Sequence, residues 1–356
     1  MRKGAMDTAE KFSRYAEWVA DESPLYASLA RAAADDDLLL DIASEARSAQ
    51  PEPELLLAAV HSLLLDGREH PLSQFYPSCG GADPDADPVP QFRDFCRANE
   101  AQLRSIVARR RCQTNDVGRS AVIRPAFEHV ARTAGTGTVA QVEIGASAGL
   151  NLNWDRYQYE FAGAGTVGPS DAPVTIESEV RGDRRPPVSR AVPTVAYRRG
   201  IDLNTLDASL EADARWLHAL IHPNRVRRHD RLEAALEVAR EHRPPLTEGD
   251  AVDALPSHLS AAPDDAALVV YSTHVLYQLD EETIANLRSV LSRHSRERRV
   301  YWLSIDPGEE LGTPTYRLVT FDDETARETQ LARFESYGKW IRWLASEDGP
   351  PSQEPS

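Results

Sequence analysis

The sequence predicts an α/β protein: a doubly wound, mostly parallel sheet of seven strands, preceded by an all-helical domain. Three observations support this prediction. Residues 9–132 have only helical periodicity. From residue 138 onward, strand-like and helix-like segments alternate. The first of these strands runs into a turn of small residues, Gly145–Gly149, a position where α/β proteins bind ligands. The length of 356 residues fits about two domains.

The first 132 residues are expected to form a helical cap domain. Phe12, Tyr15 and Val19 fall at helical spacing, and further amphipathic runs cover 29–46, 54–65 and 91–111. The acidic, proline-rich segment 80–90 is expected to be a loop.

Residues 133–345 are expected to form the sheet domain, followed by a polar tail over 346–356. Strands are predicted at 139–144, 194–201, 246–248, 267–272, 299–305, 316–321 and 329–333. Helices are predicted at 149–157, 208–222, 225–241, 251–261, 281–294 and 338–345. The last two strands are joined by a short turn, so they should form an antiparallel hairpin.

An insertion separates the first two strands of the sheet domain. Residues 157–161 alternate aromatic and polar side chains, and 174–180 alternate again after a glycine-rich turn. This pattern predicts an inserted β-hairpin over about 157–185, serving as a lid or a dimer edge.

The charge balance limits the class of partner. There are 56 acidic and 40 basic residues, a net charge of −16, and 37 of the 40 basic residues are arginine because only three are lysine. This composition indicates either a halophilic protein or the arginine bias of a GC-rich genome. In 1 M salt the Debye length is about 3 Å, so the many like charges of a halophilic protein repel one another little. Binding of duplex nucleic acid through a broad basic face is disfavoured.

Cellular location and redox state are expected from the same composition. No apolar run approaches the roughly 20 residues that span a bilayer, and the amino terminus lacks the apolar core of a signal peptide. We therefore expect a cytoplasmic protein without a membrane partner. The three cysteines show no paired spacing and are expected to be reduced. The oligomeric state is not predicted.

The turn at 145–149 is compatible with more than one ligand. In a dinucleotide fold, Ser147 would occupy the place of the second glycine of GxGxxG. In a serine hydrolase, the turn matches GxSxG, and Ser147, Asp250 and His274 follow in the chain order of a triad. Against the hydrolase, no strand is predicted upstream and no HGGG-like oxyanion segment precedes the turn.

Three segments in order resemble the class I methyltransferases that use S-adenosylmethionine. Glu143 to Gly149 resembles their acidic–x–Gly–x–Gly–x–Gly loop, Gly200-Ile-Asp202 the second-strand end that binds the ribose hydroxyls, and Gly249-Asp250-Ala251 the third-strand end that reaches the adenine. The resemblance implies S-adenosylmethionine as cofactor, bound by Glu143, Gly145, Ala146, Ser147, Gly149, Asn151, Asp202, Asp250 and Ala251.

The chemistry of this cofactor agrees with the residues. It carries no phosphate, so a serine is tolerable in the loop. Its carboxylate suits the helix start at Gly149, and its ammonium group suits acceptors near Glu143. The spacing from Gly149 to Asp202 is 53 residues, against about 20 in a standard fold, and the inserted hairpin accounts for the excess.

A wider resemblance covers the chain from about Phe12 to Leu344. The segments are similar to an uncharacterised family, domain of unknown function 2332: Tyr15-Ala-Glu-Trp18, Gln113-Thr-Asn-Asp-Val-Gly-Arg119, Trp154-Asp-Arg-Tyr157, Arg199-Gly-Ile-Asp-Leu-Asn204 and Tyr337-Gly-Lys-Trp-Ile-Arg-Trp343. The resemblance implies a shared fold with a methyltransferase-like core and implies no known reaction.

The methyl acceptor, a small molecule or a protein, is expected beyond the fourth strand. There Tyr271-Ser-Thr-His274 offers His274 as a general base or substrate ligand, or alternatively as a helix cap. Asn115 and Arg119 lie in a polar loop that either faces the site or forms a structural turn.

Two further alternatives concern Asn151 and a possible metal. Asn151 either touches the ligand or caps the helix start. His218 and His222 have the i, i+4 spacing of metal ligands but no third ligand, so no metal is predicted. A non-catalytic interaction module on a degenerate fold remains the alternative to an enzyme.

Overall fold

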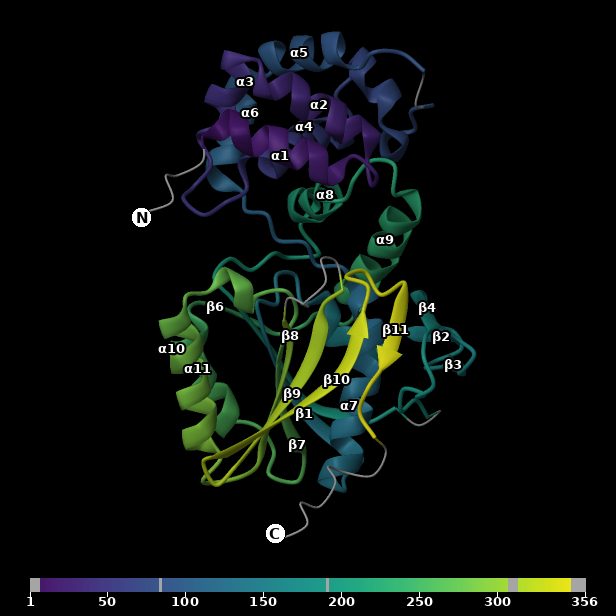
Figure 1. Ribbon diagram of the computed structural model, residues 1–356, viewed down its shortest axis with the longest axis vertical. Helices are drawn as coiled ribbons and strands as arrows, with labels where there is room; N and C mark the ends of the chain where they lie inside the picture. The colour runs from purple at the N-terminus through teal and green to yellow at the C-terminus, as the bar shows by residue number, and fades with distance from the viewer. Residues whose placement is uncertain (1–6, 83–84, 190–191, 307–312, 347–356) are drawn as a thin grey trace. The chain divides into compact units, whose positions relative to one another are not determined.

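The computed structural model describes residues 7–82, 85–189, 192–306 and 313–346 (Figure 1). Contacts within the chain define two units. We call them the helical unit, Met1–Thr114 with Leu210–Leu232, and the sheet unit, Asn115–Ser209 with Glu233–Ser356. The expected division at residue 132 differs from this one, because helix α7 (Ser120–Ala134) groups with the sheet and a later segment groups with the helices.

The helical unit is built around α4 (Glu52–Leu65), in which every residue from Leu55 to Leu64 is buried. The remaining elements are α1 (Thr8–Val19), α2 (Pro24–Ala34), α3 (Asp37–Ala43), η1 (Pro71–Phe75), η2 (Pro77–Cys79), α5 (Val89–Ala98), α6 (Glu100–Arg109), α8 (Glu211–Ala219) and the first part of α9 (Val226–Glu241). The run expected over 29–46 is two helices, because Asp36 accepts hydrogen bonds from the N–H groups of Leu38 and Leu39 and starts a new one.

The described part of the sheet unit contains one mixed sheet of eleven strands, so the expected seven-stranded, mostly parallel sheet is wrong. The order is β3-β2-β4-β11-β10-β9-β8-β7-β1-β5-β6. All seven predicted strands are present, as β1 (Thr138–Ile144), β5 (Thr194–Asp202), β6 (Leu246–Glu248), β7 (Ala267–Ser272), β8 (Val300–Asp306), β9 (Thr315–Asp322) and β10 (Thr325–Phe334). Strands β1, β5, β6, β7 and β8 are parallel.

Four further strands come from segments that were expected to form a hairpin and a helix. The insertion forms β2 (Gln158–Ala162), β3 (Gly165–Val167) and β4 (Thr175–Val180). Strands β2 and β3 are antiparallel, but β2 and β4 run parallel, so the two alternating segments are not one hairpin. The expected final helix is β11 (Trp340–Trp343), which pairs with β10 and β4 and joins the insertion to the main sheet.

The last two predicted strands, β9 and β10, form the expected antiparallel hairpin. Strand β9 is also antiparallel to β8, so it is the reversed strand of the core. No helix in the described ranges is long and apolar enough to cross a membrane.

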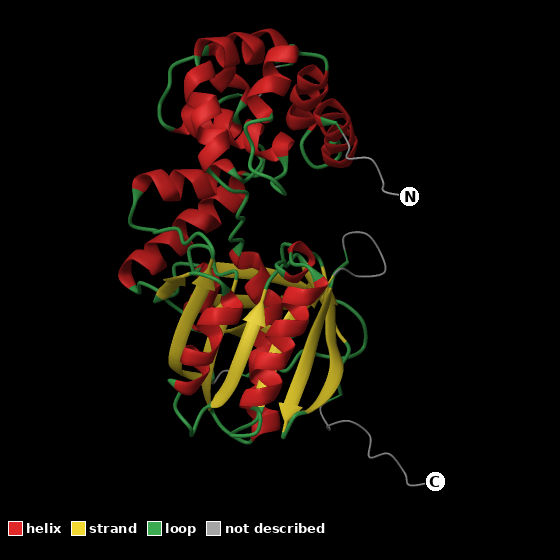
Figure 2. Cartoon of the chain, turned by 90° about the vertical axis from the view of Figure 1, so that its left-hand side faces the viewer, coloured by secondary structure: helices red, strands yellow, loops and turns green. Residues whose placement is uncertain are grey.

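Helices cover both faces of the sheet (Figure 2). On one face, α10 (Ala251–Ser260) and α11 (Glu281–His294) bury Leu255, Leu259 and Leu287 against side chains of β1, β7 and β8. On the other face lies α7, whose Phe127 contacts the rings of Trp154 and Tyr271. Burial of these apolar side chains at about 25 cal/mol per Å² is the main stabilising contribution.

Candidate functional site

The candidate site lies at the carboxyl ends of the parallel strands. Strand β1 pairs with β5 on one side and with β7 on the other, so the chain changes direction across the sheet at β1. In open α/β sheets, ligands bind in the crevice outside the carboxyl ends at such a switch point. The structure brings the 145–149 turn, Asp202 and residues 271–275 to this one edge.

The backbone N–H groups of the glycine turn are largely used within the chain. Their acceptors are Ile201 O for Gly145 (2.8 Å) and Ala146 (3.1 Å), Asp202 Oδ2 for Ser147 (2.8 Å), Ala146 O for Gly149 (2.7 Å) and Asn115 Oδ1 for Leu150 (2.9 Å). A phosphate needs such N–H groups as donors. The geometry therefore argues against a dinucleotide fold.

The helix expected after the turn is a 3₁₀ segment, η4 (Leu150–Arg156), interrupted by non-helical backbone at Asn153. Because this segment is short and its first N–H group is bonded to Asn115, it offers little positive potential to a cofactor carboxylate. The helix dipole therefore does not support the expected binding of the cofactor carboxylate at Gly149.

The glycines of the turn permit close packing. A Cβ on Gly145, whose φ is 73°, would lie 2.2 Å from Cγ2 of Val275, and one on Gly149, whose φ is 70°, would lie 2.7 Å from Cγ of Pro244. Ser147 also has a positive φ of 53°, which a non-glycine residue adopts only at a cost in free energy. The turn is therefore held at Gly145 against the segment that follows β7, and at Gly149 against the segment that leads into β6.

Asp202 ends β5, and Asp250 follows the neighbouring strand β6. Asp202 accepts hydrogen bonds from the backbone N–H groups of Ser147 and Asn204 (2.9 Å), so its carboxylate ties the turn to the end of β5. Exposed Asp250 caps α10 by accepting from Val252 N (2.7 Å), and Ala251 begins that helix. A carboxylate has about four lone-pair sites, so these contacts do not by themselves exclude a ribose or an adenine.

The same contacts bear on the alternative hydrolase triad. Ser147 is only 3 % exposed, and Asp250 is engaged as a helix cap. The positive φ of Ser147 is a feature shared with strained nucleophile turns. Among the hydrogen bonds of the described residues, none joins Ser147 to His274 or His274 to Asp250.

Glu143, at the end of β1, is a fully buried carboxyl group. Its Oε2 accepts a hydrogen bond from the Tyr271 hydroxyl (3.1 Å), while Oε1 has no hydrogen-bond partner among the described residues. Burial raises the pKa of Glu143 well above its usual range, and the Tyr271 hydroxyl and the Arg119 guanidinium only partly oppose that effect. The raised pKa favours the neutral carboxyl group, which is a weaker acceptor for an ammonium group than a carboxylate would be.

Two more buried polar groups, on Tyr316 and Asn151, lie at this edge of the sheet. We call them, together with Glu143 and Tyr271, the cluster at the carboxyl ends. Tyr316, on β9, is fully buried, and burial together with Glu143 raises its pKa. In the described part of the chain, neither its hydroxyl nor Nδ2 of Asn151 has a hydrogen-bond partner, whereas Oδ1 of Asn151 accepts from the Ser120 hydroxyl (3.1 Å). Buried polar atoms without partners are uncommon and call for an unseen water, ion or ligand.

His274 follows β7 with a positive φ of 58°, and strained backbone of this kind clusters at functional sites. Its Nε2 has no hydrogen-bond partner within the described ranges. Burial, helped by the Arg119 guanidinium and opposed by Asp116, lowers the pKa of His274 to about 3. Such an imidazole is neutral and is a weak general base, so hydrogen bonding to a ligand suits it better.

The segment containing Asn115 and Arg119 reaches this edge of the sheet. Asn115 binds the start of η4, as described above, and Arg119 is 6 % exposed and lies close enough to affect the charges of both Glu143 and His274. Both are therefore neighbours of the cluster. Gly338 packs on this segment, since a Cβ there would lie 2.0 Å from the Gly118 carbonyl oxygen.

Several buried side chains that fix η4 were missed by the sequence reasoning. Its carbonyl groups accept hydrogen bonds from Tyr157 Oη at Leu150 (2.6 Å), Gln141 Nε2 at Leu152 (2.9 Å) and Tyr159 Oη at Trp154 (2.6 Å). The aromatic residues around Trp154-Asp-Arg-Tyr157 were the available signal. The two tyrosines and Gln141 thus satisfy carbonyl groups of the segment after the turn.

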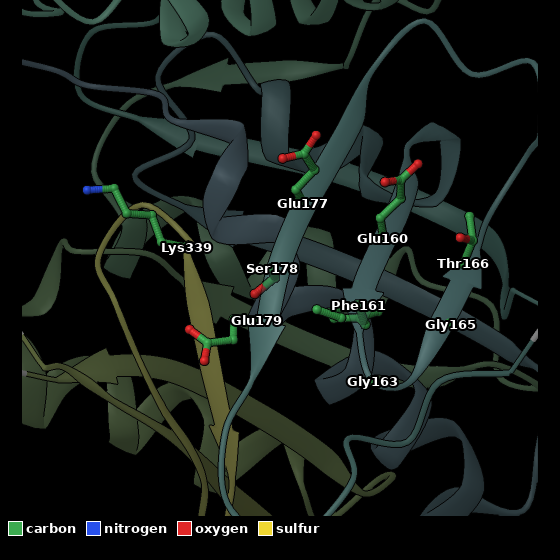
Figure 3. Close-up of a pocket in the computed structure, with 10 residues that line it drawn as sticks. Glu160, Phe161, Gly163, Gly165, Thr166, Glu177, Ser178, Glu179 and Lys339 are labelled. Carbon is green, nitrogen blue, oxygen red and sulfur yellow. The ribbon is translucent and has the colours of Figure 1, made fainter.

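A hollow of about 630 Å³ lies on the insertion (Figure 3). Its lining carries Glu160, Glu177, Glu179 and Lys339, and Glu160 faces Glu177 across parallel strands. Like charges at paired positions repel. This acidic face is separate from the cluster at the carboxyl ends.

Comparisons with known proteins give a family and nothing closer. A family described as uncharacterized protein conserved in bacteria (DUF2332) matches residues 9–343. No curated protein and no solved structure matches. Within the described ranges, no group of three or more His, Cys, Asp or Glu side chains is placed to hold a metal ion.

Proposed function

Since this chain belongs to the DUF2332 family, which assigns it no reaction, we propose a function from its own residues: the sheet unit binds S-adenosylmethionine and transfers its methyl group to a small molecule or a protein. One observation carries the proposal. The parallel strands β1, β5 and β6 lie side by side, so Glu143 and the glycine turn, Asp202 and Asp250 end at neighbouring positions of one edge. These are the three segments that resemble the methyltransferase motif.

In this proposal each strand end binds a different part of the cofactor. The Asp202 carboxylate accepts hydrogen bonds from the ribose hydroxyls, and Asp250 accepts from the adenine amino group. Neutral Glu143 donates its proton in a hydrogen bond to the cofactor carboxylate, which replaces the ammonium contact expected from the sequence. The buried polar atoms without partners support a polar ligand at this edge.

Methyl transfer is an in-line displacement at a sulfonium, so the enzyme mainly aligns the acceptor. His274 and Tyr271, at the end of β7 beside β1, are the proposed aligning groups. Because the pKa of His274 is about 3, it positions the acceptor by hydrogen bonding and does not remove its proton. The methyl–sulfur bond breaks as the bond to the acceptor forms, S-adenosylhomocysteine leaves as a neutral thioether, and a proton on the acceptor passes to solvent water. The reaction is proposed to take place in the cytoplasm.

Isothermal titration of the full chain with S-adenosylmethionine and S-adenosylhomocysteine tests the proposal, in low salt and in molar KCl. Asp202→Asn should weaken binding by about 1–3 kcal/mol if the carboxylate binds the ribose. Asp253→Asn is the matched control, because Asp253 is an exposed carboxylate in the first turn of α10 and should leave affinity unchanged.

Lack of heat at millimolar ligand in both salts would exclude the proposal and favour a non-catalytic interaction module. The hydrolase alternative has its own test. Covalent labelling by a fluorophosphonate that is lost in Ser147→Ala would favour a serine hydrolase, whereas an unlabelled native chain would exclude it.

A further inference from the structure

Four histidines meet inside the helical unit. His61 comes from α4, His218 from α8, His222 from the turn that follows α8, and His229 from α9. Three of them therefore lie in the 210–232 piece, and His61 lies in the N-terminal piece. The histidine cluster (His61, His218, His222 and His229) joins the two pieces of chain that make up the helical unit.

The pair His218–His229 depends on its protonation state. Their Nδ1 atoms are 3.1 Å apart, and the rings are stacked with centroids 5.4 Å apart and planes 3° from parallel. In such a contact one nitrogen must donate and the other must accept. When both rings are protonated, both nitrogens are donors, so the bond is lost and the two charges repel.

The other two histidines bridge the pieces. His61 is fully buried, with Nδ1 3.1 Å from the Ala219 carbonyl oxygen and Nε2 2.7 Å from the Ser78 hydroxyl. The centroids of the His61 and His229 rings are 5.7 Å apart. His222 lies 3.4 Å from the Tyr15 hydroxyl through Nε2.

The surroundings do not favour added positive charge. Tyr15, Tyr26, Tyr76 and Ser78 contact the cluster from the N-terminal piece, and Cys79 lies near Tyr26 and Tyr76. Burial raises the pKa of Tyr26, Tyr76 and Cys79, so they stay neutral. From the second piece, Arg225 and Arg228 act on His222, and Arg228 also acts on His229; Arg225 is paired with Glu22.

We propose that the histidine cluster is a pH-sensitive clasp: with neutral imidazoles it holds the 210–232 piece on the N-terminal helices, and acid releases that piece. Helix α9 begins in the released piece and ends beyond it, at Glu241.

The lowered pKa values of these histidines predict that acid weakens the clasp. Burial lowers the pKa of His61 to about 3 and those of His222 and His229 to about 4, from an ordinary 6.5. Opening then takes up protons below pH 6.5, so the clasp is fully stable above that pH and weakens as the pH falls toward the lowered values. Between pH 7.5 and pH 5, each such histidine favours opening by about 30-fold.

Hydrogen–deuterium exchange of the full chain at pH 7.5 and pH 5, corrected for intrinsic rates, tests the clasp. We expect opening of α8 and the start of α9 to increase by at least about 100-fold, while the amides of β1 keep their protection. In His229→Gln this increase should fall by about 30-fold, because one titrating group is removed. His242→Gln, at a half-exposed histidine just beyond α9, should behave like the native chain.

Two results would overturn the proposal. One is an acid response of His229→Gln equal to that of the native chain. The other, which needs no variant, is native exchange at α8 that is the same at both pH values or rises equally at β1.

Discussion

Substitution of Gly145 by alanine tests the packing of the glycine turn against the loop after β7. Two costs are expected. The φ of 73° places an L-residue in the left-handed region, at about 1–2 kcal/mol. The new Cβ would also lie 2.2 Å from Cγ2 and 3.1 Å from Cγ1 of Val275, an overpacking that costs about 1–3 kcal/mol. Gly145→Ala should therefore destabilise the sheet unit by about 2–5 kcal/mol.

The chain offers a control for each cost. Gly163 has a φ of 83° with nothing within 4 Å of its ideal Cβ, so Gly163→Ala should show the backbone cost alone, about 1–2 kcal/mol. Val275→Ala removes both clashing methyl groups. In the double variant Gly145→Ala/Val275→Ala the two changes should therefore be coupled, with about 1–3 kcal/mol recovered relative to their sum.

Unfolding in urea is monitored by hydrogen exchange of the β1 amides. These amides report on the sheet unit whether or not the helical unit unfolds with it. Additive effects in the double variant would show that the alanine at position 145 does not clash with Val275. So would a Gly145→Ala cost no larger than that of Gly163→Ala, because the close approach to Val275 would then carry no energy.

Three other outcomes are expected. In urea titrations, the gain in stability from Glu143→Gln should be larger at pH 8 than at pH 5. Because burial raises the pKa of Glu143, its carboxyl group contributes stability that is complete below the unfolded value of 4.5 and is lost as the pH rises. An equal gain at both pH values would contradict this. Glu128→Gln should cost about 3–5 kcal/mol in the same assay at pH 7, because it leaves Arg124 buried without the carboxylate at 2.8 Å. A loss below about 1 kcal/mol, the value of an exposed ion pair, would contradict it. If the net charge of −16 reflects life in salt, the melting temperature should rise from 0.1 M toward molar KCl, and a flat profile by calorimetry would favour a genomic arginine bias instead.

The strands of the core could be predicted because their sequences carry the signal locally. Residues such as Val139–Ile144 and Ala267–Ser272 are buried along almost their whole length, as parallel strands covered on both faces must be. The end of the chain could not be predicted in this way. Trp340 and Trp343 fit helical spacing, but over four residues the alternation of a strand fits equally, and pairing with β10 and β4 decides the outcome.

The candidate site was predictable as a location and less so as chemistry. The turn, Asp202 and the end of β7 share an edge because parallel strands bring their carboxyl ends together. The state of the turn was not predictable, because its N–H groups bond to acceptors on another strand, Ile201 and Asp202, and to Asn115. The neutrality of Glu143 and His274 depends in the same way on burial by distant segments.

The split origin of the helical unit has a consequence for biosynthesis. Residues 1–114 leave the ribosome well before Trp216 and Leu217, which are buried in the same unit, have been made. Until then the amino-terminal helices have an unfilled apolar surface, a condition that promotes aggregation of nascent chains. A fragment that ends at residue 114 is thus expected to aggregate unless a chaperone binds it. A fragment extended through residue 232 contains both pieces of the helical unit.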